Sequence, residues 1–271
     1  MPGGRKGRAH GFEELRLRAM RVKQCHRHQF RSSIIEFRKE TMPEHRYHQY
    51  CGLARALDVA GDRWTLLIVR ELMPGPRRFT DLIEGLPGVS RNLLAERLRG
   101  LESDGIIARQ ELPPPAARQV YELTDDGCDL ARAVAPLIAW GARRIAEREP
   151  TESFHPRWAA VAMAVLGDRE AAKGIRETYQ FVIGRSTFHL TIDDGTIRLS
   201  DGQAQDPAVT WTTDEETWAD IAFGHVTAPS AAASGALTIA GDSKAAARLR
   251  KIFSRTQMLV RAHATMERTL A

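Results

Sequence analysis

Residues 86–101 read LPGVSRNLLAERLRGL, a turn signal followed by a helical repeat. The Pro-Gly pair marks a turn, and serine is a good helix N-cap, so we expect a helix to begin after Ser90. Leu94, Leu98 and Leu101 recur at a spacing that places them on one helix face. The stretch therefore predicts a helix that buries these leucines and turns its opposite face to solvent.

The segments around this helix predict a known order of elements. Apolar residues recur at helical spacing in three earlier segments, at about 53–60, 64–72 and 79–83. After residue 105 the period changes from helical to two, which predicts a hairpin of strands 106–110 and 119–123. Thr124 is expected to cap the long helix that follows. Three compact helices followed by a β-hairpin are the order of a winged helix-turn-helix, a DNA-binding motif.

The second half of the chain predicts an α+β unit. A polar segment at 147–156 contains two prolines and is expected to be a linker. Tight-turn residues at 184–185 and 194–195 predict an antiparallel meander. The expected strands are 177–183, 186–192, 196–200, 208–211 and 236–239. The expected helices are one at 158–166, one opened by the capping box Thr213-x-x-Glu216, one near 229–233 and one at 243–253.

The predicted fold class is a mostly α winged helix-turn-helix domain followed by an α+β domain with a mainly antiparallel sheet. We expect four parts: a basic, disordered extension at 1–48, the winged helix at 51–148, the α+β domain at 156–255, and a helix or tail at 256–271. Met42 leaves two interpretations open, because residues 1–41 either are translated or lie upstream of the true start codon.

The net charge of +5 does not by itself point to nucleic acid, because the excess lies at one end of the chain. The first 50 residues hold 12 Lys/Arg and 5 Asp/Glu, whereas residues 51–150 hold 14 and 15. No apolar stretch approaches the ~20 residues of a membrane-spanning helix, and no apolar signal-peptide core follows the basic N-terminus. Three widely spaced cysteines suggest no disulfide framework. We expect a cytoplasmic protein without a membrane partner.

The helix after Ser90 is the candidate DNA reader. If its leucines face the core, the outward face carries the base-contacting candidates Ser90, Arg91, Asn92, Ala95 and Arg99. Phosphate contacts are expected from arginines before the third helix and at the hairpin, namely Arg77, Arg78 and Arg118. The alternative is that all of these are ordinary surface residues.

Cys51 is the candidate for redox control, because it opens the first helix and a helix N-terminus lowers the pKa of a thiol. The alternative is a small packed residue. A metal cluster could be drawn from Cys25, His26, His28, His45, His48 and Cys51. These residues lack the paired spacing of structural zinc sites, so we expect no metal.

The second half shows no catalytic or cofactor motif. We therefore expect no enzyme and no cofactor, and keep a catalytic second domain only as a third alternative. A sheet with apolar helices on one face can enclose an apolar cavity, but a fully packed core with a structural role is equally open.

Four short motifs carry a resemblance to a known family: LARALDVAGDRWTLLIVREL at 53–72, GPRRF at 75–79, LPGVSRNLL at 86–94, and YELT at 121–124 with Gly127. In this order they resemble HxlR-type winged-helix transcriptional regulators, relatives of the MarR group, over about 51–145. The resemblance implies a homodimer paired through its terminal helices, with the helix from Ser90 in the major groove and the hairpin on the flanking backbone. Cys51 matches a cysteine that some members use to sense electrophiles or oxidants, although Gly52 stands where members often have proline.

Residues 158–253 resemble a sterol-carrier-protein-like domain, on the order of their elements and on Gly195, Pro207 and the segment 235–241. This resemblance implies a hydrophobic tunnel for lipid-like molecules, and it identifies no ligand-contacting residue.

Together the sequence predicts a sequence-specific DNA-binding transcriptional regulator that acts as a repressor and a homodimer. Its expected partners are double-stranded DNA with a pseudo-palindromic operator, a second copy of the chain, and a hydrophobic small-molecule effector. Control is expected from that effector or from oxidation of Cys51. The alternative is a lipid-binding or carrier protein whose winged helix serves protein association.

Overall fold

The computed structural model describes residues 46–111, 118–145, 149 and 151–254. By its contacts the chain divides into two units, residues 1–58 and residues 59–271. The second unit contains the predicted α+β domain and the predicted winged helix without its first residues, 51–58. Most of the predicted N-terminal extension and the whole of the predicted tail lie outside the described residues, as do residues 112–117 between the hairpin strands.

In the first unit the described chain leads into α2 (Gly52–Ala60). The carboxylate of Asp58 fixes the segment before this helix. Its Oδ1 accepts a hydrogen bond from the backbone N–H of Tyr47 at 2.9 Å, and its Oδ2 pairs with Arg55 at 3.2 Å. The first helix predicted at about 53–60 is thus confirmed.

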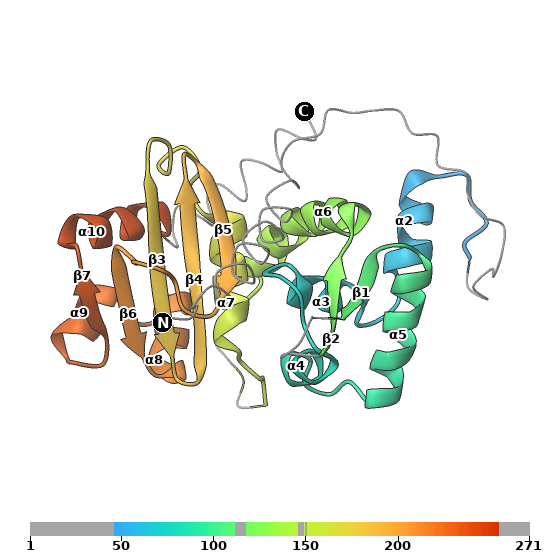
Figure 1. Cartoon of the computed structure of the whole chain (residues 1–271), viewed down its shortest axis with the longest axis horizontal. Helices are drawn as coiled ribbons and strands as arrows, with labels where there is room; N and C mark the ends of the chain where they lie inside the picture. The colour runs from blue at the N-terminus through green and yellow to red at the C-terminus, as the bar shows by residue number, and fades with distance from the viewer. Residues whose placement is uncertain (1–45, 112–117, 146–148, 150, 255–271) are drawn as a thin grey trace, which may run out of the picture. The chain divides into compact units, whose positions relative to one another are not determined.

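The winged helix occupies the first part of the second unit (Figure 1). Its described elements are α3 (Thr65–Leu72), α4 (Phe79–Gly85), α5 (Arg91–Ser103), β1 (Ile107–Glu111), β2 (Gln119–Leu123) and α6 (Asp125–Ala142). β1 and β2 pair antiparallel, and Arg77 adds an isolated bridge to Tyr121 of β2. The predicted order of helices and hairpin is confirmed.

Local capping signals explain where two of these helices begin. The Ser90 hydroxyl accepts a hydrogen bond from the Leu93 N–H at 3.2 Å, and the Thr124 hydroxyl accepts one from the Gly127 N–H at 3.1 Å. Such side-chain acceptors satisfy N–H groups that have no partner inside the helix. Both predicted N-caps are therefore confirmed.

The second part of the unit is a five-stranded mixed sheet in the order β5-β4-β3-β6-β7. Its strands are β3 (Arg176–Ile183), β4 (Ser186–Asp193), β5 (Thr196–Asp201), β6 (Val209–Thr213) and β7 (Thr238–Gly241). Its described helices are α7 (Pro156–Leu166), α8 (Glu215–Phe223), α9 (Ala228–Ala233) and α10 (Ser243–Ile252). The predicted antiparallel meander β3-β4-β5 is confirmed, whereas β6 pairs parallel with β3. Because β6 lies beyond β3, the connection after β5 has to cross the sheet to reach it.

The predicted capping box at Thr213 is wrong. Asp214 is the N-cap of α8, and its Oδ1 accepts a hydrogen bond from the Thr217 N–H at 2.7 Å. The Thr213 hydroxyl instead donates to the carbonyl of Ala236 at 2.7 Å, because Thr213 is the last residue of β6. The helix therefore starts later than the Thr-x-x-Glu pattern suggests.

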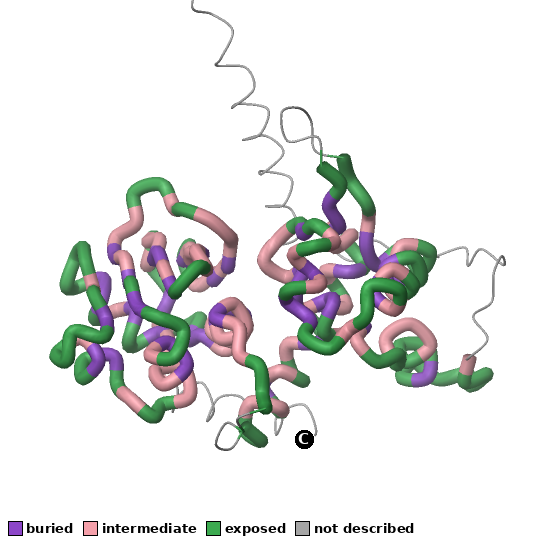
Figure 2. Tube along the Cα trace, turned by 90° about the horizontal axis from the view of Figure 1, so that it is seen from below, coloured by how far each residue is buried: buried purple, intermediate pink, exposed green. Residues whose placement is uncertain are grey.

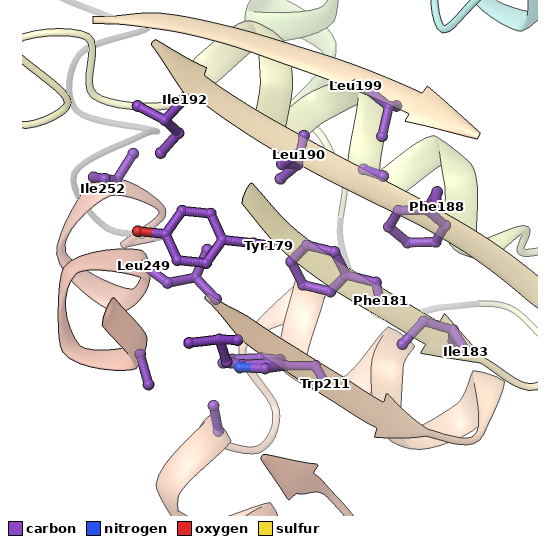
Figure 3. Packing of buried hydrophobic residues seen from close by; sticks show 14 of the residues in the cluster. Tyr179, Phe181, Ile183, Phe188, Leu190, Ile192, Leu199, Trp211, Leu249 and Ile252 are labelled. Carbon is purple, nitrogen blue, oxygen red and sulfur yellow. The ribbon is translucent and has the colours of Figure 1, made fainter. Parts of the chain in front are cut away.

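Alternating apolar residues build the core of the sheet (Figure 3). β3 and β4 turn Tyr179, Phe181, Phe188 and Leu190 to one face, all fully buried. The rings of Phe181 and Phe188 are stacked with centroids 5.3 Å apart, and the ring of Trp218 from α8 lies 5.4 Å from Phe181. Aromatic rings thus occupy the centre of this face of the sheet. It is the face for which the sequence left two alternatives open, an apolar cavity and a fully packed core.

The second unit has two apolar cores, one in the winged helix and one on the sheet. Figure 2 shows the buried segments within each part surrounded by exposed ones. Met73 at the end of α3 and Ile138 of α6 pack against both cores. The two cores are therefore connected through apolar contacts. In the described part of the chain, no helix combines the length and apolar character needed to span a membrane.

Candidate DNA-binding surface

The outward side of α5 carries the residues predicted to contact base edges. Ser90, Arg91, Asn92 and Arg99 are exposed and Ala95 is half-buried, whereas Leu94, Leu98 and Leu101 on the opposite side are at most 3% exposed. We call Ser90, Arg91, Asn92, Ala95 and Arg99 the reading face. The structure brings these five side chains together as the leucine spacing predicts, and their contact with DNA remains a prediction.

The arginines of α5 differ in their partners. Arg97 pairs with Asp62 at 2.8 Å and with Glu96 at 3.2 Å. Among the described residues, no carboxylate lies within ion-pair distance of Arg91 or Arg99. Their charges are therefore free to be neutralised by an external anion such as phosphate.

A strained turn before α3 supports the start of α5. Trp64 is the N-cap of α3 and has a φ of 82°, a left-handed conformation that is unfavourable for a bulky residue. The edge of its ring lies 3.7 Å from the position that a Cβ at Gly88 would occupy, and Asp62 of the same turn holds Arg97. This support was not predicted, because turn residues and α5 are far apart in the sequence. The Asp-Arg-Trp motif is the only sequence signal that marks it.

Two of the predicted phosphate contacts, one at the start of α4 and one at the hairpin, are accessible. Arg78 and Arg118 are exposed, and residues 112–117 next to Arg118 lie outside the described residues. Arg109 of β1, which sequence reasoning missed, lies over the Tyr121 ring at 5.4 Å and pairs with Glu102 at 3.2 Å. Arg109 is therefore already engaged within the protein.

Arg77, which was predicted to contact phosphate, is instead buried and paired within the protein. Arg77 is only 6% exposed, and its Nη2 pairs with Asp201 Oδ2 at 2.6 Å. Its Nε donates a hydrogen bond to the backbone carbonyl of Glu71 at 3.2 Å. The backbone bridge to Tyr121 turns the side chain inward, so Arg77 and its neighbour Arg78 lie in opposite environments.

A separate cluster of largely buried polar residues, which we call the junction, joins the winged helix to the sheet part. It consists of residues from both parts of the second unit: Arg70, Glu71, Arg77, Arg157, Trp158 and Asp201. Glu71 is 1% exposed, and its Oε1 accepts hydrogen bonds from Arg70 Nη2 at 2.7 Å and from Trp158 Nε1 at 2.8 Å. The Arg70 guanidinium lies 4.4 Å from the centre of the Trp158 ring. Burial lowers the pKa of Arg70.

Asp201, the last residue of β5, neutralises the other side of the junction. Its Oδ1 pairs with Arg157 at 3.0 Å, and its Oδ2 pairs with Arg77. Burial and the nearby charge of Arg77 lower the pKa of Arg157. His155 caps α7 here by accepting a hydrogen bond from the Arg157 N–H at 3.4 Å, and burial together with the Arg157 charge lowers its pKa.

In the first unit, Cys51 is an exposed free thiol at the start of α2. Hydrogen bonds from the backbone N–H groups of Ala54 and Leu53 lower its pKa. This is the environment that favours a thiolate, and the sensor role itself stays a prediction. Among the residues that the structure describes, no group of three His, Cys, Asp or Glu side chains is placed to hold a metal ion. Of the six candidates for a metal cluster, only His48 and Cys51 lie in the described part.

Large apolar side chains are exposed on both terminal helices of the winged helix. On α2 these are Leu53 and Leu57, and on α6 they are Leu137 and Trp140. The apolar side chains of α6 are thus only partly buried in the core.

Two family descriptions match this chain. Residues 59–149 match the HxlR-like helix-turn-helix model, and residues 164–254 match the SCP-2 sterol transfer family. The HTH-type transcriptional regulator YodB of Bacillus subtilis is 40% identical over 85 residues, which cover 31% of this chain and 76% of that protein.

Two solved structures are also similar to parts of the chain. The reduced form of YodB from B. subtilis shares 36% identity, with a TM-score of 0.32, over 35% of this chain and 94% of that one. The inverting sec-alkylsulfatase Pisa1 from Pseudomonas sp. shares 21% identity, with a TM-score of 0.35, over 37% of this chain and 16% of that one.

Proposed function

The chain belongs to the HxlR-like helix-turn-helix family, and from this premise we propose that it is a cytoplasmic, sequence-specific DNA-binding repressor. The observation that carries the proposal is the reading face, where Arg91 and Arg99 are exposed and without an ion pair in the described structure on a helix whose other side is buried. In this proposal Arg91 and Asn92 read base edges, while Ser90, Ala95 and Arg99 lie along the same groove. Arg78 and Arg118 contact phosphates. No catalytic step is part of it.

We propose further that the protein acts as a homodimer. The exposed Leu137 and Trp140 of α6, and Leu53 and Leu57 of α2, are apolar surface that a second copy would cover. Dimers of this motif read half-sites about 34–36 Å apart, so the operator should be pseudo-palindromic.

The test is a selection from random DNA with purified full-length protein, followed by footprinting. Arg91→Ala should relax base preference at one position in each half-site, at a cost of about 1–3 kcal/mol for the preferred base. Arg78→Ala should weaken all sequences alike and lower the salt slope by about 1 to 2 for the dimer. Arg185→Ala, at an exposed arginine of the β3–β4 turn, is the control and should leave both unchanged. Equal losses on all sequences for both variants would contradict the assigned roles.

For the control of DNA binding we propose an apolar effector in the SCP-2 part, with oxidation of Cys51 as the alternative. The match of residues 164–254 to the SCP-2 sterol transfer family supports the first, and the lowered pKa of the Cys51 thiol supports the second. Native mass spectrometry of freshly purified protein would report a carried ligand and the dimer together. If Cys51→Ser keeps the response of DNA affinity to an oxidant, Cys51 has no part in control.

The same match also favours a second candidate function, that of a lipid-binding or carrier protein whose winged helix serves protein association. An apolar fluorophore distinguishes the two. Binding of the fluorophore together with a failure of the DNA selection would favour the carrier, whereas a selected operator would exclude a role in protein association alone.

A further inference from the structure

Arg77 is a point where three parts of the winged helix meet. Its backbone N–H donates to the Tyr121 carbonyl at 2.8 Å, and its carbonyl accepts from the Tyr121 N–H at 2.7 Å, which ties it to β2. Its Nε donates to the carbonyl of Glu71 in α3. The next residue, Arg78, is the N-cap of α4. A displacement of Arg77 would therefore move the hairpin and α4 together.

The charge of Arg77 is neutralised from outside the winged helix. Asp201 of β5 lies 2.6 Å from its Nη2, and among the described residues no other carboxylate lies within ion-pair distance of Arg77. Both side chains are largely buried, with 7% and 30% of their surface exposed. Without Asp201, the guanidinium groups of Arg77 and Arg157 would face each other with no shared counter-charge, which is costly in a buried site.

The position of Asp201 is set inside the sheet. The next residue, Gly202, has a φ of 82°, so the chain turns sharply there, and its N–H donates to the Thr187 carbonyl at 2.9 Å. The Gly202 carbonyl is hydrogen-bonded to the His189 ring at 3.1 Å.

A buried glutamine of the sheet also holds this segment. Gln180, which is 2% exposed, donates to the carbonyls of Phe188 at 2.8 Å and Gly202 at 3.4 Å, and accepts from the Ala204 N–H.

We propose that Asp201 is a positioning residue for DNA binding: it holds Arg77, and through it the hairpin and α4, in the arrangement that binds DNA. A change in the sheet that moves residues 201–204 would then shift Arg77 and alter DNA binding. This inference rests on the proposed function and names the residue through which the SCP-2 part would control it. If the two parts were joined only by a flexible linker, they would act independently, and a change at Asp201 would leave DNA binding unchanged.

The test uses the full-length protein and the DNA sequence selected with the wild type. Asp201→Asn keeps the size of the side chain and removes its charge. We expect it to lower DNA affinity at least about fivefold, the lower end of typical coupling between sites. Amide exchange at Tyr121, whose N–H donates to Arg77, should speed up while exchange in α10 stays unchanged. Asp193→Asn, at an exposed carboxylate of β4 paired with Arg176, is the matched control and should change neither quantity.

Further variants distinguish a positioning role from general damage. Asp201→Glu keeps the charge with one added methylene, so it should retain more affinity than Asp201→Asn. If Asp201→Asn does not fold, Arg77→Gln breaks the same ion pair, and wild-type affinity and exchange in that variant overturn the proposal. The double variant Arg77→Gln with Asp201→Asn should lose less affinity than the sum of the two single losses, because both changes break the same Arg77–Asp201 ion pair. Additive losses would contradict that.

The two hypotheses fail in different ways. If the wild type selects no DNA sequence, the proposed function is wrong, and the exchange measurement on the free protein still decides whether Asp201 holds the hairpin. If the wild type binds its selected sequence and Asp201→Asn matches it in both affinity and exchange, the proposed function stands and this inference is wrong.

Discussion

The reading face and the junction are two arginine-rich regions of the same unit with opposite environments. On the reading face, Arg91 and Arg99 are exposed and have no ion pair among the described residues. In the junction, Arg70 and Arg77 have carboxylates at 2.7 and 2.6 Å and little or no contact with water. An exposed, unpaired charge contributes little to folding and is available to a partner. A buried pair is costly to break, because removal of one member leaves the other charged and unsolvated. Substitutions should therefore affect stability in one region and binding in the other.

The largest expected effect is the loss of Glu71. Glu71→Ala leaves the Arg70 guanidinium and the Trp158 N–H without their shared acceptor, so we expect the free energy of unfolding to fall by about 3–5 kcal/mol. Urea denaturation followed by tryptophan fluorescence measures it. Glu96→Ala on α5, where the carboxylate is 62% exposed beside Arg97, is the matched control and should cost about 0–1 kcal/mol. Similar losses in both variants would remove the difference between the two regions.

A smaller effect is expected from close packing against the same carboxylate. A Cβ at Gly85, the last residue of α4, would collide with the Glu71 carboxylate, so Gly85→Ala should lower the free energy of unfolding by about 1–3 kcal/mol. In the Glu71→Ala background the collision disappears, and the cost of Gly85→Ala should fall to near zero. A cost that stays the same in both backgrounds would mean that Glu71 is not the obstacle.

Gly100 provides the counterpart on the reading helix. A Cβ there would meet nothing within 4 Å, and alanine is favoured over glycine in a helix interior. Gly100→Ala should therefore raise the free energy of unfolding by about 0.5–1 kcal/mol, measured in the same denaturation series.

The reading face was predictable because its signals are local. Ser90 caps the helix through Leu93, three positions along, and the leucine spacing alone fixes which side faces solvent. Strand pairing in the meander likewise follows from turn residues between neighbouring strands.

The junction was not predictable from the same kind of evidence. Arg77 and Arg78 are adjacent arginines, and only the pairing of the Arg77 backbone with Tyr121, together with Asp201 from β5, sends one inward and leaves the other exposed. The parallel pairing of β6 with β3 also depends on a chain crossing that no local pattern specifies. Contacts between residues far apart in the sequence leave no periodicity, and they decide which polar residues are buried.

The smallest expected effect is a pH dependence of the free energy of unfolding that comes from the junction and not from the reading face. The reading face contains no histidine, whereas His155 borders the junction and its pKa is lowered by burial and by the Arg157 charge. A histidine with a lowered pKa binds fewer protons in the folded state than in the unfolded state. Its contribution to stability is therefore present above about pH 6.5, the unfolded value, and is lost as the pH falls toward the folded pKa.

His155→Asn tests this with the cap retained, since asparagine is a good N-cap and does not titrate. Between pH 7 and pH 5 the wild type should lose more of its free energy of unfolding than His155→Asn does, measured by urea denaturation at each pH. Parallel pH curves for the two proteins would show that His155 is not the titrating group. A steeper curve for the variant would reverse the sign and contradict the burial of a neutral imidazole beside Arg157.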